Sequence, residues 1–404
     1  MQIKKPYISP SFSYVPLEET LEILPKKQDL FIGIPKETSF QESRVALTPE
    51  AVSVLVNNGH DVAVEHNAGE GSFYFDSDYS EAGARIVYEK AEVYKATTII
   101  KSAPISEEEV ALLQPNQVII SPIHLPFLKK DMLEQLLHKK IIAIAFDSIK
   151  DDSGTYPIVR SMSEIAGSSA ILTAAKYLNT GHNGKGILLG GISGVPPARV
   201  LILGAGVVGE FAARTALGLG AMVMIFDNSI YRLMRLQNNI GKRCFTSVLD
   251  PVTLAEELAN ADVAVGALKP VNGITPVVVT EEMVSNMKAG SVIIDVSIDR
   301  GGCFETSKVT SHENPVYRKY DVIHYCVPNI ASGVSRTASR AISNVLMPII
   351  QQCADRGGFE GLIQAKAGIR NGVYLYKGCV TNAPIAKRFN FKYTDLDLLL
   401  AMPS

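Results

Sequence analysis

A short apolar run followed by three regularly spaced glycines most constrains the fold of this chain. Residues 200–203 are Val-Leu-Ile-Leu, and Gly204, Gly206 and Gly209 follow with the spacing G-x-G-x-x-G. Four consecutive apolar residues are typical of a parallel strand that is buried on both faces. Glycines with this spacing are typical of a tight turn between a strand and a helix. The pattern therefore predicts a strand, a turn and a helix of a doubly wound α/β domain.

Each part of this turn has its own role in binding a dinucleotide. Gly204 lets the chain turn, Gly206 leaves space for a pyrophosphate beside the backbone, and Gly209 lets the helix approach the strand. The N-terminus of the helix, at Val207 and Val208, offers free N–H donors to the phosphates. We expect these five residues to bind the cofactor; a doubly wound domain with a degenerate turn is the alternative.

An aspartate at the end of the next apolar run indicates which cofactor is bound. Asp227 follows the run Met222 to Phe226 and lies 23 positions after Gly204, close to the roughly 20 positions of the fingerprint. A carboxylate at this position accepts hydrogen bonds from the adenosine ribose and repels a 2′-phosphate. The next residue, Asn228, brings no cation. The sequence predicts NAD in preference to NADP.

Length and composition narrow the class of protein. A chain of 404 residues is long enough for two or three domains. A net charge of -2 with 20% charged residues gives no basic footprint for nucleic acid or an anionic membrane, so we expect small-molecule substrates and self-association. The five cysteines are scattered without C-x-x-C pairing, which indicates neither a disulfide framework nor a metal site. No apolar window reaches 18 residues, and we expect a cytoplasmic protein.

Apolar runs alternate with helical segments on both sides of the glycine turn, which predicts two α/β domains with mostly parallel sheets and a cleft between them. We expect Thr48 to cap a helix that ends near Gly59, and Ser161 or Ser163 to cap a helix that reaches Tyr177. The expected strands are residues 30–34, 61–64, 97–100, 118–121, 141–146, 200–203, 222–226, 263–267, 292–296 and 324–327. The other expected helices are residues 80–83, 106–113, 129–138, 230–239, 253–259, 281–287 and 335–354.

Several blocks of sequence resemble alanine dehydrogenase and the NAD-binding α subunit of proton-translocating transhydrogenase. They are Ile32 to Glu37, Arg44 to Pro49, Met162 to Gly167, the glycine turn and Asp299 to Glu305. The resemblance runs in matching order from about residue 30 to about residue 385. It implies two Rossmann-like domains, the first closed by the C-terminal segment. The implied substrate domain is residues 1–157 and 336–404, the implied NAD-binding domain is residues 158–335, and the implied assembly is a homo-oligomer, a hexamer or a dimer.

This resemblance also implies a reaction and its residues: reversible oxidative deamination of L-alanine to pyruvate and ammonia with NAD. Arg44 falls on the arginine that holds the substrate carboxylate, a task that suits a guanidinium fork. His124 falls on the catalytic histidine, which exchanges protons near neutral pH, and Asp299 on the aspartate that orients ammonia or water. Each residue also has a purely structural alternative. Arg44 could form a surface ion pair, His124 could be a structural histidine, and Asp299 could cap the turn before Gly301. Ser163 and Asn329 fall at cofactor-binding positions.

The chain departs from alanine dehydrogenases at a lysine that binds the substrate carbonyl. Those enzymes have Lys-Val-Lys-Glu-Pro after the third strand, whereas this chain has Ile-Lys-Ser-Ala-Pro. Ser102 takes the place of the second lysine, and Lys101 is one position off, which in an extended segment directs it to the other face. Either the loop is rearranged so that Lys101 binds substrate, or the carbonyl is polarised differently. The Ala-Pro pair is closer to the transhydrogenase branch.

Other departures leave alternative functions open. The segment 266–273 lacks the usual Pro-Gly beside the nicotinamide, Arg300 replaces a glutamine, and Pro-Asn-Ile-Ala at 328–331 stands where Ala-Asn-Met-Pro is usual. The alternatives to an alanine dehydrogenase are the NAD(H)-binding subunit of a transhydrogenase-type enzyme and a non-catalytic NAD-binding homologue.

Overall fold

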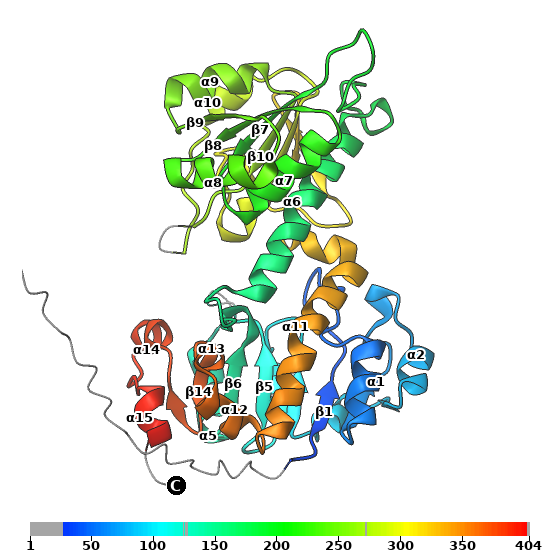
Figure 1. Cartoon of the computed structure of the whole chain (residues 1–404), viewed down its shortest axis with the longest axis vertical. Coiled ribbons are helices and arrows are strands. Elements are labelled where there is room, and N and C mark those ends of the chain that lie inside the picture. The colour runs from blue at the N-terminus through cyan, green and yellow to red at the C-terminus, as the bar shows by residue number, and fades with distance from the viewer. Residues whose placement is uncertain (1–26, 124, 126–127, 271–272, 402–404) are drawn as a thin grey trace, which may run out of the picture.

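The chain forms two α/β lobes joined by two long helices (Figure 1). The computed structural model describes residues 27–123, 125, 128–270 and 273–401. Lobe 1 contains the sheet formed by the N-terminal and C-terminal segments, and lobe 2 contains the sheet of the middle segment. The helices α6 (Pro157–Leu178) and α11 (Ser335–Asp355) connect the lobes.

The sheet of lobe 1 has eight strands in the order β15-β14-β6-β5-β4-β1-β2-β3. The pairs among β1 to β6 are parallel, whereas β14 is antiparallel to both β6 and β15. The C-terminal strands thus join the first sheet, as the family resemblance implied. The strands are β1 (Phe31–Ile34), β2 (Asp61–Glu65), β3 (Arg85–Val87), β4 (Thr98–Ile100), β5 (Val118–Ser121), β6 (Ile142–Ala145), β14 (Val373–Tyr376) and β15 (Cys379–Val380).

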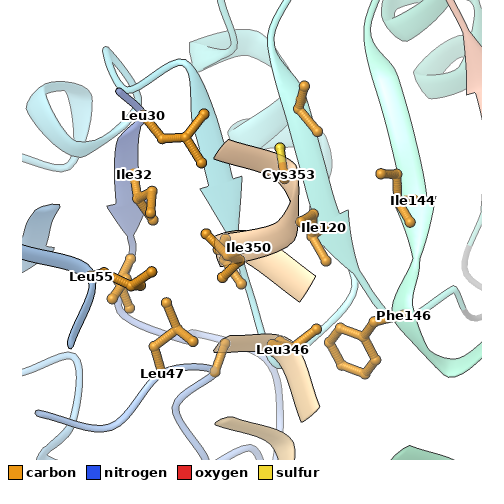
Figure 2. Packing of buried hydrophobic residues seen from close by; sticks show 14 of the residues in the cluster. Leu30, Ile32, Leu47, Leu55, Ile120, Ile144, Phe146, Leu346, Ile350 and Cys353 are labelled. Carbon is orange, nitrogen blue, oxygen red and sulfur yellow. The ribbon is translucent and has the colours of Figure 1, made fainter. Parts of the chain in front are cut away.

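Alternate side chains of these strands pack into cores on the two faces of the sheet. On one face, Ile32 and Ile120 contact the core formed with α11, where Leu346 and Ile350 are buried (Figure 2). On the other face, Ile119 belongs to a second core. Burial on both faces explains why these strands are continuous apolar runs. The helices of lobe 1 are α1 (Pro49–Asn57), α2 (Asp76–Glu81), α3 (Lys90–Val93), α4 (Glu107–Leu112), α5 (Lys130–His138), α12 (Phe359–Ala365), α13 (Ala367–Arg370), α14 (Ala383–Phe389) and α15 (Leu396–Ala401).

The sheet of lobe 2 has seven strands in the order β12-β13-β11-β10-β7-β8-β9. All neighbours are parallel except β12, which is an antiparallel edge strand beside β13. The strands are β7 (Arg199–Leu203), β8 (Met222–Phe226), β9 (Phe245–Ser247), β10 (Val263–Gly266), β11 (Val292–Asp295), β12 (Val316–Lys319) and β13 (Val322–Tyr325). The helices are α7 (Val207–Gly218), α8 (Ile230–Ile240), α9 (Pro251–Asn260) and α10 (Glu281–Ser285). Both sheets are therefore mostly parallel, in agreement with the predicted fold class.

Short 3₁₀ helices follow several strand ends and carry residues of the candidate site. They are η1 (Glu70–Ser72), η3 (Phe146–Ser148), η4 (Thr180–His182), η5 (Val296–Arg300) and η6 (Ile330–Val334). Three of them, η3, η5 and η6, come after β6, β11 and β13. The carboxyl ends of parallel strands are where such folds bind ligands.

The sequence prediction was wrong about the start of α6. The helix begins at Pro157, which is a favoured first helical residue, so neither Ser161 nor Ser163 is the cap. Their hydroxyls lie inside the helix and donate to the carbonyls four residues back, of Pro157 and Val159. Thr48 does occupy the N-cap position of α1, but its side chain makes no cap hydrogen bond to the helix.

Two general searches of the described ranges bear on the kind of protein. Within them, no helix is both long and apolar enough to cross a membrane. Over the same residues, no three His, Cys, Asp or Glu side chains gather into a group that could hold a metal ion.

Candidate functional site in the crevice between the lobes

The glycine turn after β7 has the geometry that its spacing predicts. Gly204 has φ +114°, and a Cβ there would lie 2.3 Å from the carbonyl oxygen of Ala267. A Cβ on Gly209 would lie 1.8 Å from the carbonyl oxygen of Gly204, so the helix packs directly against the turn. A Cβ on Gly206 would meet no atom within 4 Å. The turn is thus closed by two glycines and leaves open space at the third.

The open space lies at the N-terminus of α7. Gly206 is the N-cap of this helix, Val207 and Val208 are its first residues, and all three are half-buried. The first N–H groups of a helix have no partner within it and favour an anion. A pyrophosphate placed here would approach bare backbone.

Asp227 follows β8 and closes the same turn from the side. Its carboxylate accepts hydrogen bonds from the N–H of Ala205 at 2.8 Å and of Ser229 at 2.8 Å, and the residue is 5% exposed. The guanidinium of Arg232 lies 3.7 Å from the same carboxylate. The sequence reasoning considered only Asn228 as a possible cation position and missed Arg232, which lies one turn into α8.

Asp299 and Asn329 lie together on the lobe 2 side of the crevice. Asp299 belongs to η5, which follows β11, and Asn329 is the N-cap of η6. The backbone N–H of Asn329 donates to the carboxylate of Asp299 at 2.9 Å. Asn329 has φ 54° and ψ 44°, a left-handed conformation that asparagine tolerates better than most residues.

Arg44 lies on the lobe 1 side and is paired with Glu42. Its Nε donates to Glu42 Oε1 at 2.7 Å, and Nη2 pairs with Oε2. The remaining terminal nitrogen, Nη1, lies 3.3 Å from Met162 Sδ on α6. Burial opposes the charge of Arg44, but Glu42, and at longer range Glu37 and Asp299, outweigh it and raise the pKa. The guanidinium stays charged and keeps N–H groups that a substrate carboxylate could use.

Direct hydrogen bonds connect the residues of lobe 1 with those of lobe 2. Asn329 Nδ2 donates to Glu42 Oε2 at 3.2 Å, so a continuous path runs from Arg44 through Glu42 and Asn329 to Asp299. Nearby, the N–H of Ser43 donates to the hydroxyl of Ser332 at 2.9 Å. The structure thus brings together three of the predicted residues, Arg44, Asp299 and Asn329.

Lys101 does not face these residues. Its Nζ donates to Glu37 Oε2 at 2.7 Å and Glu109 Oε1 at 2.9 Å, and the side chain is 1% exposed. Burial lowers the pKa of Lys101, but the two carboxylates outweigh it and the net shift is upward. A contact between Lys101 and a substrate would require the amino group to leave both carboxylates.

Ser102, at the place of the expected lysine, holds the backbone instead. Its hydroxyl donates to the carbonyl oxygen of Arg44 at 2.8 Å, and its N–H donates to Glu37 Oε1 at 2.6 Å. Glu37 also accepts from the N–H of Ala103 at 3.1 Å. Glu37 therefore fixes the loop after β4, and Ser102 links that loop to Arg44.

The remaining predicted residues are placed as follows. His124 lies outside the described residues, and its predicted role stays a prediction. Its neighbour Ile123 donates through its backbone N–H to Asp147 Oδ1 at 3.3 Å. Ser163, on α6, donates its hydroxyl to Val159 and is next to Met162, which contacts Arg44.

Sequence reasoning missed Glu37, Glu42 and Asp147 as residues of this region. Glu37 lies within a block that carries the resemblance, and Glu42 lies two positions before Arg44, which were signals that could have been used. Asp147 comes directly after a predicted strand, the usual place for a ligand-binding side chain in such sheets.

The structure has two lobes with mostly parallel sheets, a glycine turn that is open at the start of a helix, and polar side chains from both lobes that lie together. These features define a class of protein. It is the class of two-lobed α/β proteins whose ligands lie in the crevice between the lobes.

Comparison with known proteins identifies the family. Residues 33–166 match the family model "Alanine dehydrogenase/PNT, N-terminal domain" and residues 170–383 match "Alanine dehydrogenase/PNT, C-terminal domain". The chain is 38% identical over 367 residues to an alanine dehydrogenase of Staphylococcus epidermidis, which covers 91% of this chain and 98% of the relative. It is 38% identical over 372 residues to alanine dehydrogenase 2 of Staphylococcus aureus, covering 92% and 100%.

Solved structures give the same result. An L-alanine dehydrogenase superposes with a TM-score of 0.83 at 34% identity, covering 89% of this chain and 99% of that one. A transhydrogenase from Sinorhizobium meliloti superposes with a TM-score of 0.74 at 25% identity, covering 87% and 99%. The chain belongs to the alanine dehydrogenase/PNT family, an oxidoreductase family that binds NAD(H).

Proposed function

We propose that this protein catalyses the reversible oxidative deamination of L-alanine: L-alanine, NAD⁺ and water give pyruvate, ammonium, NADH and a proton. The observation that carries the proposal is the hydrogen-bonded path Arg44–Glu42–Asn329–Asp299 across the crevice. This path connects a guanidinium of lobe 1, which suits a substrate carboxylate, with an acidic side chain of lobe 2. The relatives named above support the choice of alanine as substrate.

The residues of the glycine turn fit the cofactor. The space at Gly206 would accept a pyrophosphate, the N-terminus of α7 would offer N–H donors, and Asp227 would bind the adenosine ribose. We assign cofactor binding to Gly204, Gly206, Val207, Val208, Gly209 and Asp227, together with Ser163 and Asn329. Bound there, NAD supplies the hydride acceptor. Residues 158–335 form the NAD-binding domain in this proposal, and residues 1–157 and 336–404 the substrate domain.

The protein side chains orient the substrate and move its protons. Arg44 holds the carboxylate, with Glu42 fixing the plane of the guanidinium. Asp299 accepts a hydrogen bond from the attacking water or the leaving ammonia, and His124 takes the proton that water loses as it adds to the imine carbon.

A direct assay tests this function. The full-length protein with NAD and L-alanine at alkaline pH should form NADH, with equimolar pyruvate and ammonium. Arg44→Gln should lower kcat/KM at least a hundredfold, because a charge-assisted bidentate contact is lost. A protein that binds NADH but shows neither direction of the reaction would overturn the proposal.

A second function is kept because of the segment after β4. Ala103 and Pro104 there are closer to the transhydrogenase branch, and Lys101 is held away from the crevice by Glu37 and Glu109. In this alternative, the chain binds NAD(H) and passes hydride to NADP(H) on another protein. NADH oxidation that depends on such an NADP-binding partner, and not on pyruvate with ammonium, would favour it.

A further inference from the structure

Gln41 connects the segment that carries Arg44 to lobe 2. It lies between β1 and α1, three residues before Arg44, in a segment without helix or strand. Its Nε2 donates to the carbonyl oxygen of Thr310 at 3.4 Å, and its Oε1 accepts from the backbone N–H of His312 at 3.1 Å. Both partners belong to the segment between β11 and β12 of lobe 2. One side-chain amide therefore bonds to the backbone of the other lobe through both of its polar atoms.

The backbone conformation of Gln41 indicates a role for its side chain. Its φ is +61°, in the left-handed region, which costs free energy for a residue with a Cβ but not for glycine. A glycine at this position would form the same turn with less strain. The glutamine keeps the strained conformation while its amide makes the two hydrogen bonds to lobe 2. What the side chain adds is therefore the connection between the lobes.

The lobe 2 segment that Gln41 contacts is bonded to the strand that leads to Asn329. The N–H of Thr310 donates to the carbonyl oxygen of Cys326 at 3.0 Å, and the N–H of Cys326 donates to the hydroxyl of Thr310 at 3.3 Å. Cys326 directly follows β13 and lies three residues before Asn329. Asn329 in turn donates through its backbone to Asp299. Gln41 thus bonds to a segment that is tied to the lobe 2 half of the candidate site.

Further contacts join the same parts of the two lobes. Asn329 Nδ2 lies 3.4 Å from the carbonyl oxygen of Gln41 and 3.2 Å from Glu42 Oε2, as donor to both. The backbone N–H of Ser43 donates to the hydroxyl of Ser332 at 2.9 Å. Three consecutive residues therefore bond to lobe 2, directly before the arginine that we assign to the substrate carboxylate.

We propose that Gln41 is a positioning residue that keeps Arg44 at a fixed place relative to Asp299, so that both can act on one small substrate. This inference rests on the proposed function, which assigns the substrate carboxylate to Arg44. A three-carbon amino acid spans a short distance, and misplacement of a group by about 1 Å can cost a hundredfold in rate. Without the side chain of Gln41, a smaller fraction of molecules has the required arrangement, and the apparent substrate affinity falls by that fraction.

Replacement of Gln41 by glycine removes the amide and relieves the backbone strain at the same time. In the full-length protein, Gln41→Gly should raise the KM for L-alanine, and the Kd of pyruvate at saturating NADH, at least tenfold, because two hydrogen bonds between the lobes are lost. The kcat should stay within twofold, since saturating substrate restores the arrangement. The Kd of NADH should also stay within twofold, because the glycine turn is unchanged. Steady-state kinetics and nicotinamide fluorescence measure these constants.

Hydrogen exchange at the backbone amide of Ser43 gives a readout that does not depend on activity. This amide donates to Ser332 of lobe 2, so it reports on contact between the lobes beyond the bonds of Gln41 itself. Gln41→Gly should make it exchange at least tenfold faster. The matched control is Asn116→Gly, because Asn116 is also left-handed, with φ +64°, but is exposed two residues before β5, at the strand end opposite to the candidate site. This control should change neither the exchange nor the affinities.

A third variant separates the two hydrogen bonds of the amide. Gln41→Glu keeps an acceptor for the N–H of His312 but has no donor for the carbonyl oxygen of Thr310. Its affinity for pyruvate should therefore fall between those of the wild-type protein and Gln41→Gly.

Several outcomes would overturn the inference. Unchanged affinities for L-alanine and pyruvate in Gln41→Gly, or unchanged exchange at Ser43, would mean that Gln41 makes a local contact only. A lower kcat with an unchanged KM would also reject it, because Gln41 would then affect the reaction step and not the arrangement of the lobes. If the wild-type protein neither oxidises L-alanine nor binds pyruvate, but Gln41→Gly still speeds exchange at Ser43, the proposed function is wrong and the connection of the lobes by Gln41 stands.

Discussion

The two lobes hold their halves of the site by different physical means. In lobe 2 the glycine turn is set by backbone shape: Gly204 and Gly209 leave no room for a Cβ, and the turn keeps one form because its atoms are in contact. In lobe 1 the loop after β4 is set by side-chain charge, since Glu37 accepts hydrogen bonds from Lys101 and from three donors of the loop at once. One half is held by close packing and the other by a buried ion pair.

The difference explains how each half should respond to change. Backbone packing is insensitive to salt and pH but intolerant of a single methyl group. A buried ion pair tolerates small changes of shape but fails when one charge is removed, because the other charge remains buried without a partner. Each lobe therefore has a characteristic weakness.

The largest effect is expected at Lys101. Lys101→Met removes the cation between Glu37 and Glu109 and should destabilise lobe 1 by about 3–5 kcal/mol. Hydrogen exchange of the β4 amides measures this lobe separately. The matched control is Lys90→Met: Lys90 lies 3.1 Å from the same Glu109 but is far more exposed, and its loss should cost less than about 1 kcal/mol. If Lys101→Met and Lys90→Met destabilise lobe 1 equally, the buried ion pair of Lys101 is not what holds this lobe's half of the site.

A pair of glycine variants tests lobe 2. Gly209→Ala should destabilise the lobe by about 3 kcal/mol, because the new Cβ would overlap the carbonyl oxygen of Gly204. Gly206→Ala should leave stability unchanged, since its Cβ meets nothing, but should weaken NADH binding about tenfold or more by occupying the phosphate space. Unfolding in urea and NADH titration separate the two outcomes. Loss of stability in Gly206→Ala would show that the turn is not open.

Acid should reveal a smaller effect at His324 in lobe 2. Burial lowers the pKa of His324 from its ordinary value of 6.5 to about 4, so the folded state binds the proton more weakly than the unfolded state. Stability should therefore be lost as pH falls from about 6.5 towards 4, by about 2 kcal/mol at pH 5. His324→Gln should flatten this dependence in thermal unfolding at pH 7 and pH 5, whereas His138→Gln, at an exposed position on α5, should not. If His324→Gln keeps the pH dependence of the wild-type protein, His324 is not the group that causes the loss of stability in acid.

The smallest effect is expected on α6, which joins the lobes. Ser161 and Ser163 have the same local bonding, each to a carbonyl four residues back, but only Ser163 is predicted to bind the cofactor. Ser163→Ala should weaken NADH binding about fivefold, the value of one hydrogen bond, and Ser161→Ala should leave it unchanged. Equal affinities of the two variants would remove Ser163 from the cofactor site.

The same contrast explains what the sequence revealed. The glycine turn and Asp227 were predicted because their roles follow from local spacing, and the alternation of apolar runs gave the mostly parallel sheets. The ion pairs of Lys101 with Glu37 and Glu109 were not predicted from the sequence, because these residues meet only after β1 and β4 lie side by side. Strands such as β3, β12 and β15 are short edge segments, with too few apolar residues to show a period.

The start of α6 was misplaced for a related reason. Serines before an apolar periodic segment indicate a cap, but the same hydroxyls can bond to carbonyls inside a helix. Pro157 at the true start was a competing signal that fits a first helical position. Only the complete hydrogen-bond pattern distinguishes the two.

One long helix reaches both halves of the site. On α6, Met162 contacts the guanidinium of Arg44, and five residues later a Cβ on Gly167 would lie 2.3 Å from the carbonyl oxygen of Val208, at the start of α7. The same helix therefore packs against both halves of the candidate site. If the nucleotide binds at the glycine turn and the acid at Arg44, as proposed, α6 contacts both binding elements, and any effect of one ligand on the affinity for the other must be reciprocal.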